Sequence, residues 1–157
     1  MKYYLLLLLA VISLQCNTTP NMQQTPVTIH AIRLKPGQDL QQEIDSLVAR
    51  EHITAGWIMT CVGSLTQTNL RYANQPNGSS LQGHFEIVSL TGTVSINGSH
   101  LHMSISDSTG TTIGGHLLPG NIIYTTAEIV IGQSHQHIFT REKDGTTPWE
   151  ELQIQKQ

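Results

Sequence analysis

The chain has few of the residues that characterise nucleic-acid-binding surfaces. Only 12% of its 157 residues are charged and 5% are aromatic, and the formal net charge is −3. The eight Lys and Arg residues are scattered along the sequence, without a basic cluster interleaved with aromatic residues. Because binding to a phosphate backbone requires a clustered basic surface, no nucleic-acid partner is predicted.

Cysteine is nearly absent as well. Cys16 ends an N-terminal apolar segment, so Cys61 is the one cysteine in the rest of the chain, and an intramolecular disulfide in a mature domain is excluded. A domain of this size buries a sufficient core without one. Cys61 lies in an apolar, strand-like run over residues 55–62, which predicts a buried and inert thiol rather than a nucleophile.

Residues 1–15 have the pattern of a signal peptide. Lys2 precedes a mainly apolar run over residues 5–14, which is too short to span a membrane. The run ends in Leu-Gln-Cys, which resembles a loose bacterial lipobox in which Cys16 becomes the lipidated first residue. Cleavage by the ordinary signal peptidase and a retained anchor are the alternatives. We expect an exported lipoprotein, held at the cell envelope on the periplasmic or surface side by its lipid alone.

The segment after this signal separates into a tether and one domain. Residues 16–26 are rich in Asn, Thr, Gln and Pro and have no apolar periodicity, which is typical of a flexible tether after Cys16. From residue 27 to 157, turn signals separate β-rich runs, which indicates a single sheet-dominated domain. One helix is predicted after Asp39, its N-cap, with an apolar face at helical spacing. That face consists of Leu40, Ile44, Leu47 and Val48.

Three histidines have a spacing that suits a metal site. His100 and His102 would project from the same face of a strand over residues 99–106. Residues 107–110 predict a tight turn, and the returning strand would bring His116 alongside that pair. Three His ligands with an open fourth position are typical of catalytic zinc. The alternative is that all three are ordinary polar strand residues. We predict a site for one divalent metal ion, zinc in the first instance.

The same region resembles a known family, the PPC domain, also called DUF296, which occurs alone in prokaryotes and beside AT-hooks in plants. The resemblance covers most of residues 27–154. It is carried by residues 63–65, 85–93, 100–107, 110, 113–117, 120, 126–131, 141, 144 and 147–152.

This resemblance implies an α+β fold with a mixed, largely antiparallel sheet and few helices, assembled as a homotrimer. The low charge content agrees with subunit contact, because exposed sheet edges must be covered or paired. The metal site would lie near a subunit boundary, where a neighbour could supply Arg141 or Glu86. Arg141 and Asp144 are expected to form a structural pair or to line that boundary. The fold is also similar to that of acetolactate decarboxylase, a zinc enzyme, although fold alone does not determine function.

Two carboxylates are candidates for proton transfer. Glu86 and Glu128 both lie in strand-like runs, and a metal-bound water requires a nearby group to accept its proton. For Glu128 the alternative is a hydrogen bond to a neighbouring strand. His135 and His137 repeat the spacing of the first His pair but lie outside the family motif, so we interpret them as a solvated strand end.

Two hypotheses from different classes follow. The first is a lipid-anchored metal-binding module of unknown activity, with a small-molecule ligand. The second is a metal-dependent hydrolase or lyase acting on a small carbonyl substrate, in which Glu86 or Glu128 moves a proton. DNA binding by analogy with the plant proteins ranks last. A histidine site that opens into a cleft beside a carboxylate favours the enzyme, whereas a fourth protein ligand favours a structural site.

Overall fold

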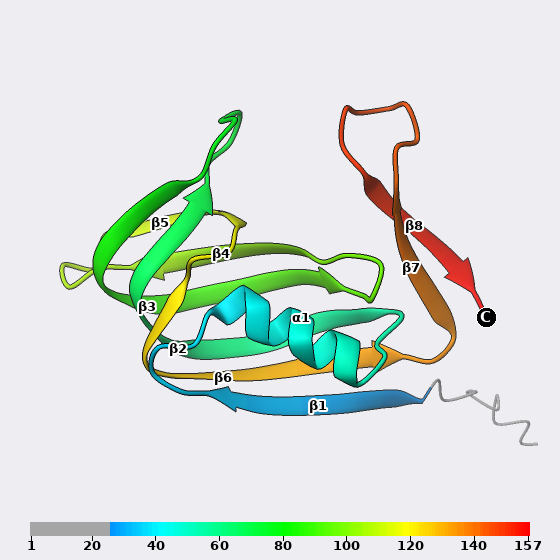
Figure 1. The fold of residues 1–157 in the computed structure, drawn as a ribbon, viewed down its shortest axis with the longest axis horizontal. Coiled ribbons are helices and arrows are strands. Elements are labelled where there is room, and N and C mark those ends of the chain that lie inside the picture. The colour runs from blue at the N-terminus through cyan, green and yellow to red at the C-terminus, as the bar shows by residue number, and fades with distance from the viewer. Residues whose placement is uncertain (1–25) are drawn as a thin grey trace, which may run out of the picture.

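The computed structural model describes residues 26–157 (Figure 1). The predicted signal peptide over residues 1–15, the predicted lipidation site Cys16 and all but the last residue of the predicted tether over residues 16–26 lie outside the described residues. Among residues 26–157, no helix is long and apolar enough to cross a membrane.

The described residues form two antiparallel sheets and one helix. The larger sheet has the strand order β1-β6-β2-β3-β4-β5, and β5 also pairs with the end of β2, so β2 to β5 close on themselves. The smaller sheet consists of β7 and β8. This confirms the predicted largely antiparallel sheet with few helices. The elements are β1 (Val27–Leu34), α1 (Leu40–Arg50), β2 (Gly56–Arg71), β3 (Ser79–Val94), β4 (His100–Ser106), β5 (Thr112–Leu117), β6 (Ile122–Ser134), β7 (His137–Glu142) and β8 (Glu151–Lys156).

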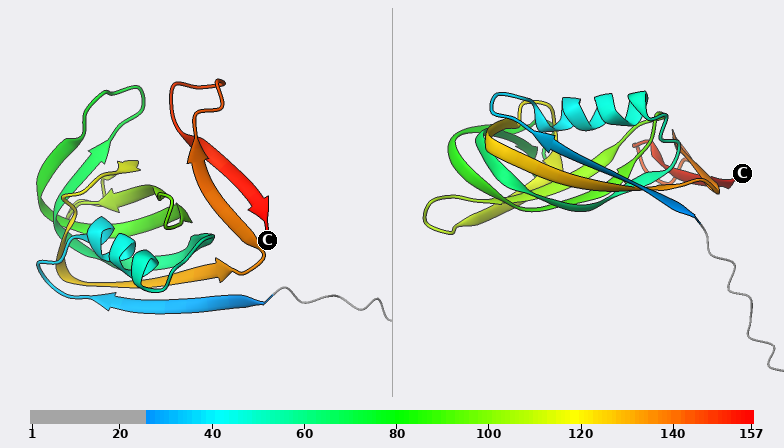
Figure 2. Two further views of the ribbon diagram at one scale, coloured as in Figure 1. Left: turned by 45° about the vertical axis from the view of Figure 1, so that its right-hand side comes forward. Right: turned by 90° about the horizontal axis from the view of Figure 1, so that it is seen from below.

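The helix α1 packs across one face of the larger sheet (Figures 1 and 2). As predicted, Asp39 is its N-cap, and the side chain accepts hydrogen bonds from the backbone N–H groups of Gln41 and Gln42. The second carboxylate oxygen of Asp39 accepts a hydrogen bond from the backbone of Gly120, at 2.6 Å. The cap therefore also fixes the helix to the turn before β6. The predicted apolar face is buried, and it consists of Leu40, Ile44, Leu47 and Val48.

The core lies between α1 and the larger sheet and continues into the curled strands β2 to β5. Cys61 on β2 is part of it, with 8% of its surface exposed. Burial raises the pKa of the Cys61 thiol to about 12, because a thiolate is poorly solvated in apolar surroundings. The predicted burial of Cys61 is confirmed, and the raised pKa agrees with an unreactive thiol.

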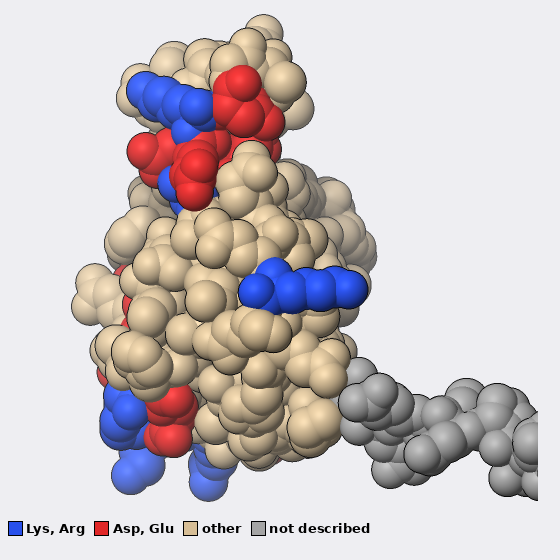
Figure 3. Space-filling model, turned by 90° about the vertical axis from the view of Figure 1, so that its right-hand side faces the viewer, with Lys and Arg blue, Asp and Glu red and all other residues tan. Residues whose placement is uncertain are grey.

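The β7–β8 hairpin stands beside the larger sheet (Figure 2). Phe139 on β7 attaches it, because its backbone N–H donates to Thr54 and its carbonyl accepts from the side chains of Ser95 and Asn97. The loop over residues 143–150 connects β7 to β8, and its Trp149 lies against Arg71 at the end of β2. Charged side chains gather at this end of the hairpin, while most of the face seen in Figure 3 carries few charges.

Candidate metal centre

The three histidines of the predicted site come from two adjacent strands. His100 and His102 are on β4, where Leu101 and Met103 are buried and the two imidazoles lie on the opposite, exposed face. His116 is on β5, directly opposite His102 in the antiparallel register. The predicted strand, turn and returning strand are therefore all present, and the structure brings the three side chains together.

The turn between the two strands determines this register. The Asp107 side chain accepts hydrogen bonds from the backbone N–H groups of Thr109 and Thr111. Gly110 has φ +83°, a conformation that favours glycine. Gly115 permits a further close approach, because a Cβ there would lie 2.7 Å from the carbonyl oxygen of Arg71 on β2. Glycine at that position therefore allows β5 to lie against both β4 and β2.

The three histidines lie close enough together to hold one metal ion. One potential ligand atom from each histidine lies within 4.8 Å of the others. The Nε2 atoms of His100 and His102 are 3.2 Å apart. Two ligands of a tetrahedral zinc at about 2.0 to 2.1 Å would be about 3.3 to 3.4 Å from one another. The His100–His102 pair therefore has the spacing of two ligands of one ion.

Burial and neighbouring charges favour the neutral form of two of these imidazoles. Burial is the main cause that lowers the pKa of His116, to about 4, and the positive charge of Arg71 adds to it. Burial also lowers the pKa of His100, followed by the charge of Arg141. At neutral pH these side chains are uncharged, which is the state in which histidine binds a metal.

One ring nitrogen of His116 has no partner among the described residues. Its Nδ1 atom is buried and makes no hydrogen bond. A buried polar nitrogen without a partner is costly, and such an atom often marks a binding position. Three converging imidazoles, one with an unsatisfied nitrogen, therefore fit a borderline-soft divalent cation such as zinc.

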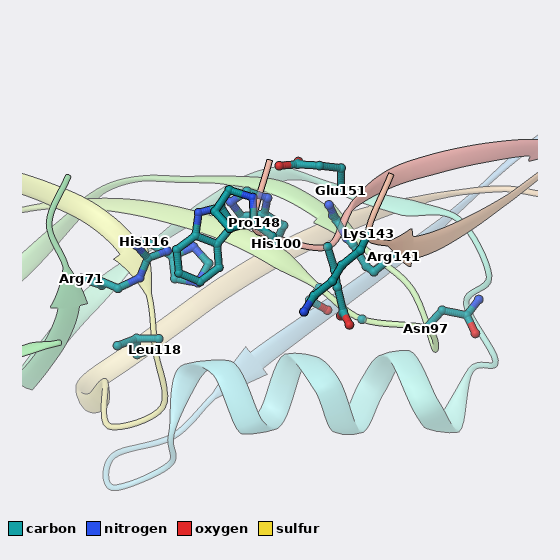
Figure 4. A pocket seen from close by; sticks show the side chains of 13 residues that line it. Arg71, Asn97, His100, His116, Leu118, Arg141, Lys143, Pro148 and Glu151 are labelled. Carbon is teal, nitrogen blue, oxygen red and sulfur yellow. The ribbon is translucent and has the colours of Figure 1, made fainter. Parts of the chain in front are cut away.

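The cluster borders a cavity of about 670 Å³ between β4, β5 and the β7–β8 hairpin (Figure 4). His100 and His116 line it together with charged side chains, of which the sequence had suggested only Arg141, as a residue supplied by a neighbouring subunit. These are Arg71, Arg141, Lys143, Glu150 and Glu151, and Trp149 also contributes. The carboxylate of Glu151 is near enough to His100 and Arg141 to affect their pKa values.

The two predicted catalytic carboxylates lie elsewhere. Glu86 is exposed on β3 opposite Ser106, four residues along β4 from His102, or about 13 Å at the usual rise of a strand. Glu128 is exposed on β6, which β2 and β3 separate from β4. Neither carboxylate lines the cavity beside the histidines.

Two other predictions concern polar residues near the chain end. Arg141 and Asp144 do not form a pair: the guanidinium donates to Thr93 at 2.6 Å, whereas the carboxylate accepts from Thr146. The reason is that Asp144 lies in the loop after β7 and is held there by its own turn. His135 and His137 lie outside the cluster, and His137 hydrogen-bonds to Ser134.

The histidines lie within the part of the sequence that a family model matches. The model of the Plants and Prokaryotes Conserved (PCC) domain matches residues 22–135. The chain belongs to this family, which is the PPC domain expected from the sequence. The PCC match contains the three histidines and Arg71, whereas Arg141, Trp149 and Glu151 lie beyond it.

Known proteins share both the sequence and the fold of this PCC domain. The structure of a hypothetical protein from Salmonella enterica is 39% identical, with a TM-score of 0.82, and the match covers 85% of this chain and 96% of that one. A metal-containing protein from Archaeoglobus fulgidus has a TM-score of 0.72 at 23% identity, covering 83% and 96% of the two chains. This second likeness concerns the fold alone.

One curated relative is a much larger protein. The bifunctional protein GlmU of a Synechococcus strain is 45% identical over 127 residues, which are 81% of this chain. The chain spans only about a fifth of the length of that relative (20%). The match therefore shows the family of the PCC domain and nothing about the activity of the larger protein.

Proposed function

We propose that this PCC-domain protein binds one divalent metal ion, zinc in the first instance, through His100, His102 and His116. The observation that carries the proposal is the convergence of three imidazoles from two paired strands, one with an unsatisfied buried nitrogen. The Archaeoglobus protein, described as metal-containing, is a precedent for the fold rather than for these residues. Metal analysis of the purified protein tests the proposal, with about one zinc per chain as the expected result.

A second candidate function is metal-dependent hydrolysis or lyase chemistry on a small carbonyl substrate. The observation that favours it is an open site, because the three histidines have no fourth Cys, His, Asp or Glu beside them among the described residues. The cluster also borders the cavity that Glu151 lines. A bound zinc would supply Lewis-acid polarisation there. Glu151 is better placed than Glu86 or Glu128 to hold a proton. A screen of small esters and keto acids, with Glu151→Gln as the comparison, separates this candidate from a pure binding role.

We also propose that the protein is exported and anchored by lipid on Cys16. Replacing Cys16 with serine is expected to release the protein from the membrane fraction or to leave it unprocessed, because the thiol that accepts the lipid is lost. Metabolic labelling with palmitate, followed by fractionation, measures this. Labelling that is the same in both forms would contradict the proposal, and Cys61→Ser is the matched control that should label normally.

Assembly as a homotrimer is the third part of the proposal. Large apolar side chains remain exposed on the adjacent strands β2 and β3, including Met59 at 52%, Val62 at 57% and Val88 at 56%. Contact between copies would bury this surface. Light scattering on residues 27–157 with zinc present is expected to give three times the mass of one chain. A monomeric mass at micromolar concentration would remove both the trimer and any site shared between subunits.

A further inference from the structure

The cavity beside the histidines carries an excess of positive charge. Three cationic side chains line it, those of Arg71, Arg141 and Lys143, against the two carboxylates of Glu150 and Glu151. The one salt bridge among residues 26–157 joins Arg50 to Glu51 outside this cavity. The guanidinium groups in the cavity are therefore not neutralised by direct ion pairs.

Arg71 reaches the site from the end of β2. It is the pairing partner of His116, so the two side chains leave the sheet on the same face. Its guanidinium carbon lies 5.2 Å from the centre of the Trp149 ring, a cation–π contact with the loop before β8. This contact orients the guanidinium without using its N–H donors on a carboxylate.

Arg141 reaches the site from the other side, on β7. Its Nη2 donates to the hydroxyl of Thr93, and Thr93 is the pairing partner of His100 on β4. In the β7–β8 hairpin, Arg141 pairs with Leu152, which is the residue after Glu151. The two arginines thus approach different members of the histidine cluster, Arg71 beside His116 and Arg141 beside His100.

We propose that this cavity binds a small organic anion, through a carboxylate or phosphate group held between Arg71 and Arg141 and directed at the histidine cluster. A planar guanidinium donates two parallel hydrogen bonds to either group, which a lysine cannot do. The volume of about 670 Å³ suits a small molecule rather than a polymer. A metal ion on the histidines would add positive charge to that of the arginines and would coordinate one oxygen of the anion. In this respect the inference rests on the proposed metal site.

The test uses cobalt(II)-loaded protein, because the visible absorption of cobalt reports its ligands. Titration with acetate and with inorganic phosphate is expected to change the spectrum, whereas acetamide, the uncharged analogue of acetate, should not. The two anions distinguish a carboxylate site from a phosphate site. Arg71→Gln and Arg141→Gln should each weaken anion binding by about tenfold or more, as expected for loss of a charge-assisted hydrogen bond. Both variants should keep the wild-type cobalt stoichiometry.

Arg50→Gln is the matched control, since Arg50 lies at the end of α1 and pairs with Glu51 away from the cavity. It should leave the anion titration unchanged. Anion affinities that are equal in all three variants and the wild type would overturn the anion site while the metal site stands. Failure to bind cobalt would instead overturn the proposed function. Calorimetric titration of the same four proteins with phosphate then decides the anion site, and heats that do not depend on Arg71 or Arg141 would overturn it.

Discussion

Replacing His102 with alanine is expected to abolish stoichiometric zinc binding. His102 is the central member of the cluster, because it pairs with His116 across the strands and its Nε2 lies 3.2 Å from that of His100. Loss of a direct ligand should exceed the roughly 10- to 100-fold loss of affinity that is typical of supporting residues. The side chain is exposed, so the fold should tolerate the change. Competition against a zinc chromophore measures the dissociation constant.

A second measurement connects binding with stability. Free zinc at about 100 times its dissociation constant should stabilise the wild-type fold by about 2.7 kcal/mol, because the ion binds the native state only. Thermal unfolding of the alanine variant should be insensitive to zinc. His135→Ala is the control, since His135 is exposed and contacts Thr28 rather than the cluster. Equal zinc affinity in all three proteins would mean that the three imidazoles are ordinary polar strand residues.

Replacing Gly92 with alanine is expected to destabilise the domain by about 3 to 5 kcal/mol, the range for backbone strain combined with overlap in a packed sheet. Gly92 lies on β3 opposite Leu101, and its φ of +141° is a conformation that side chains rarely adopt. A Cβ there would overlap the carbonyl oxygen of His100 and lie 2.9 Å from its carbonyl carbon. The substitution would therefore displace the backbone of β4 at His100, the first histidine of the cluster. Urea unfolding followed by circular dichroism measures the effect.

Gly110→Ala is the matched control for this change. Gly110 also has a positive φ, +83°, but no atom lies within 4 Å of a Cβ built there. It should cost only about 1 kcal/mol, the conformational penalty alone. If both substitutions lower the unfolding free energy equally, the close approach of Gly92 to β4 contributes nothing. A further expectation is that Gly92→Ala weakens zinc binding, whereas Gly110→Ala changes it much less.

The sequence was sufficient for the parts of this protein that local rules determine. Side chains two apart on a strand share a face, so the spacing of His100 and His102 predicts that they lie side by side. The turn residues from Asp107 to Gly110 determine the hairpin register and hence the position of His116. The N-cap Asp39 and the apolar face of α1 follow from helical periodicity in the same way. The family was recognisable because its motif includes the histidine strand, the turn and the returning strand.

The surroundings of the cluster depend on contacts between distant segments, which neither spacing nor periodicity encodes. Arg71 lies beside His116 only because the end of β2 pairs with β5. Arg141 and Glu151 reach the cavity because the β7–β8 hairpin is anchored to the larger sheet through Phe139. The same long-range pairing places Glu86 and Glu128 away from the histidines. Their position in strand-like runs had made both carboxylates candidates for the site. Strand periodicity and the turn therefore determined which three imidazoles meet. Only the tertiary structure decided which charged side chains surround them, because their positions depend on how separate strands and hairpins pack together.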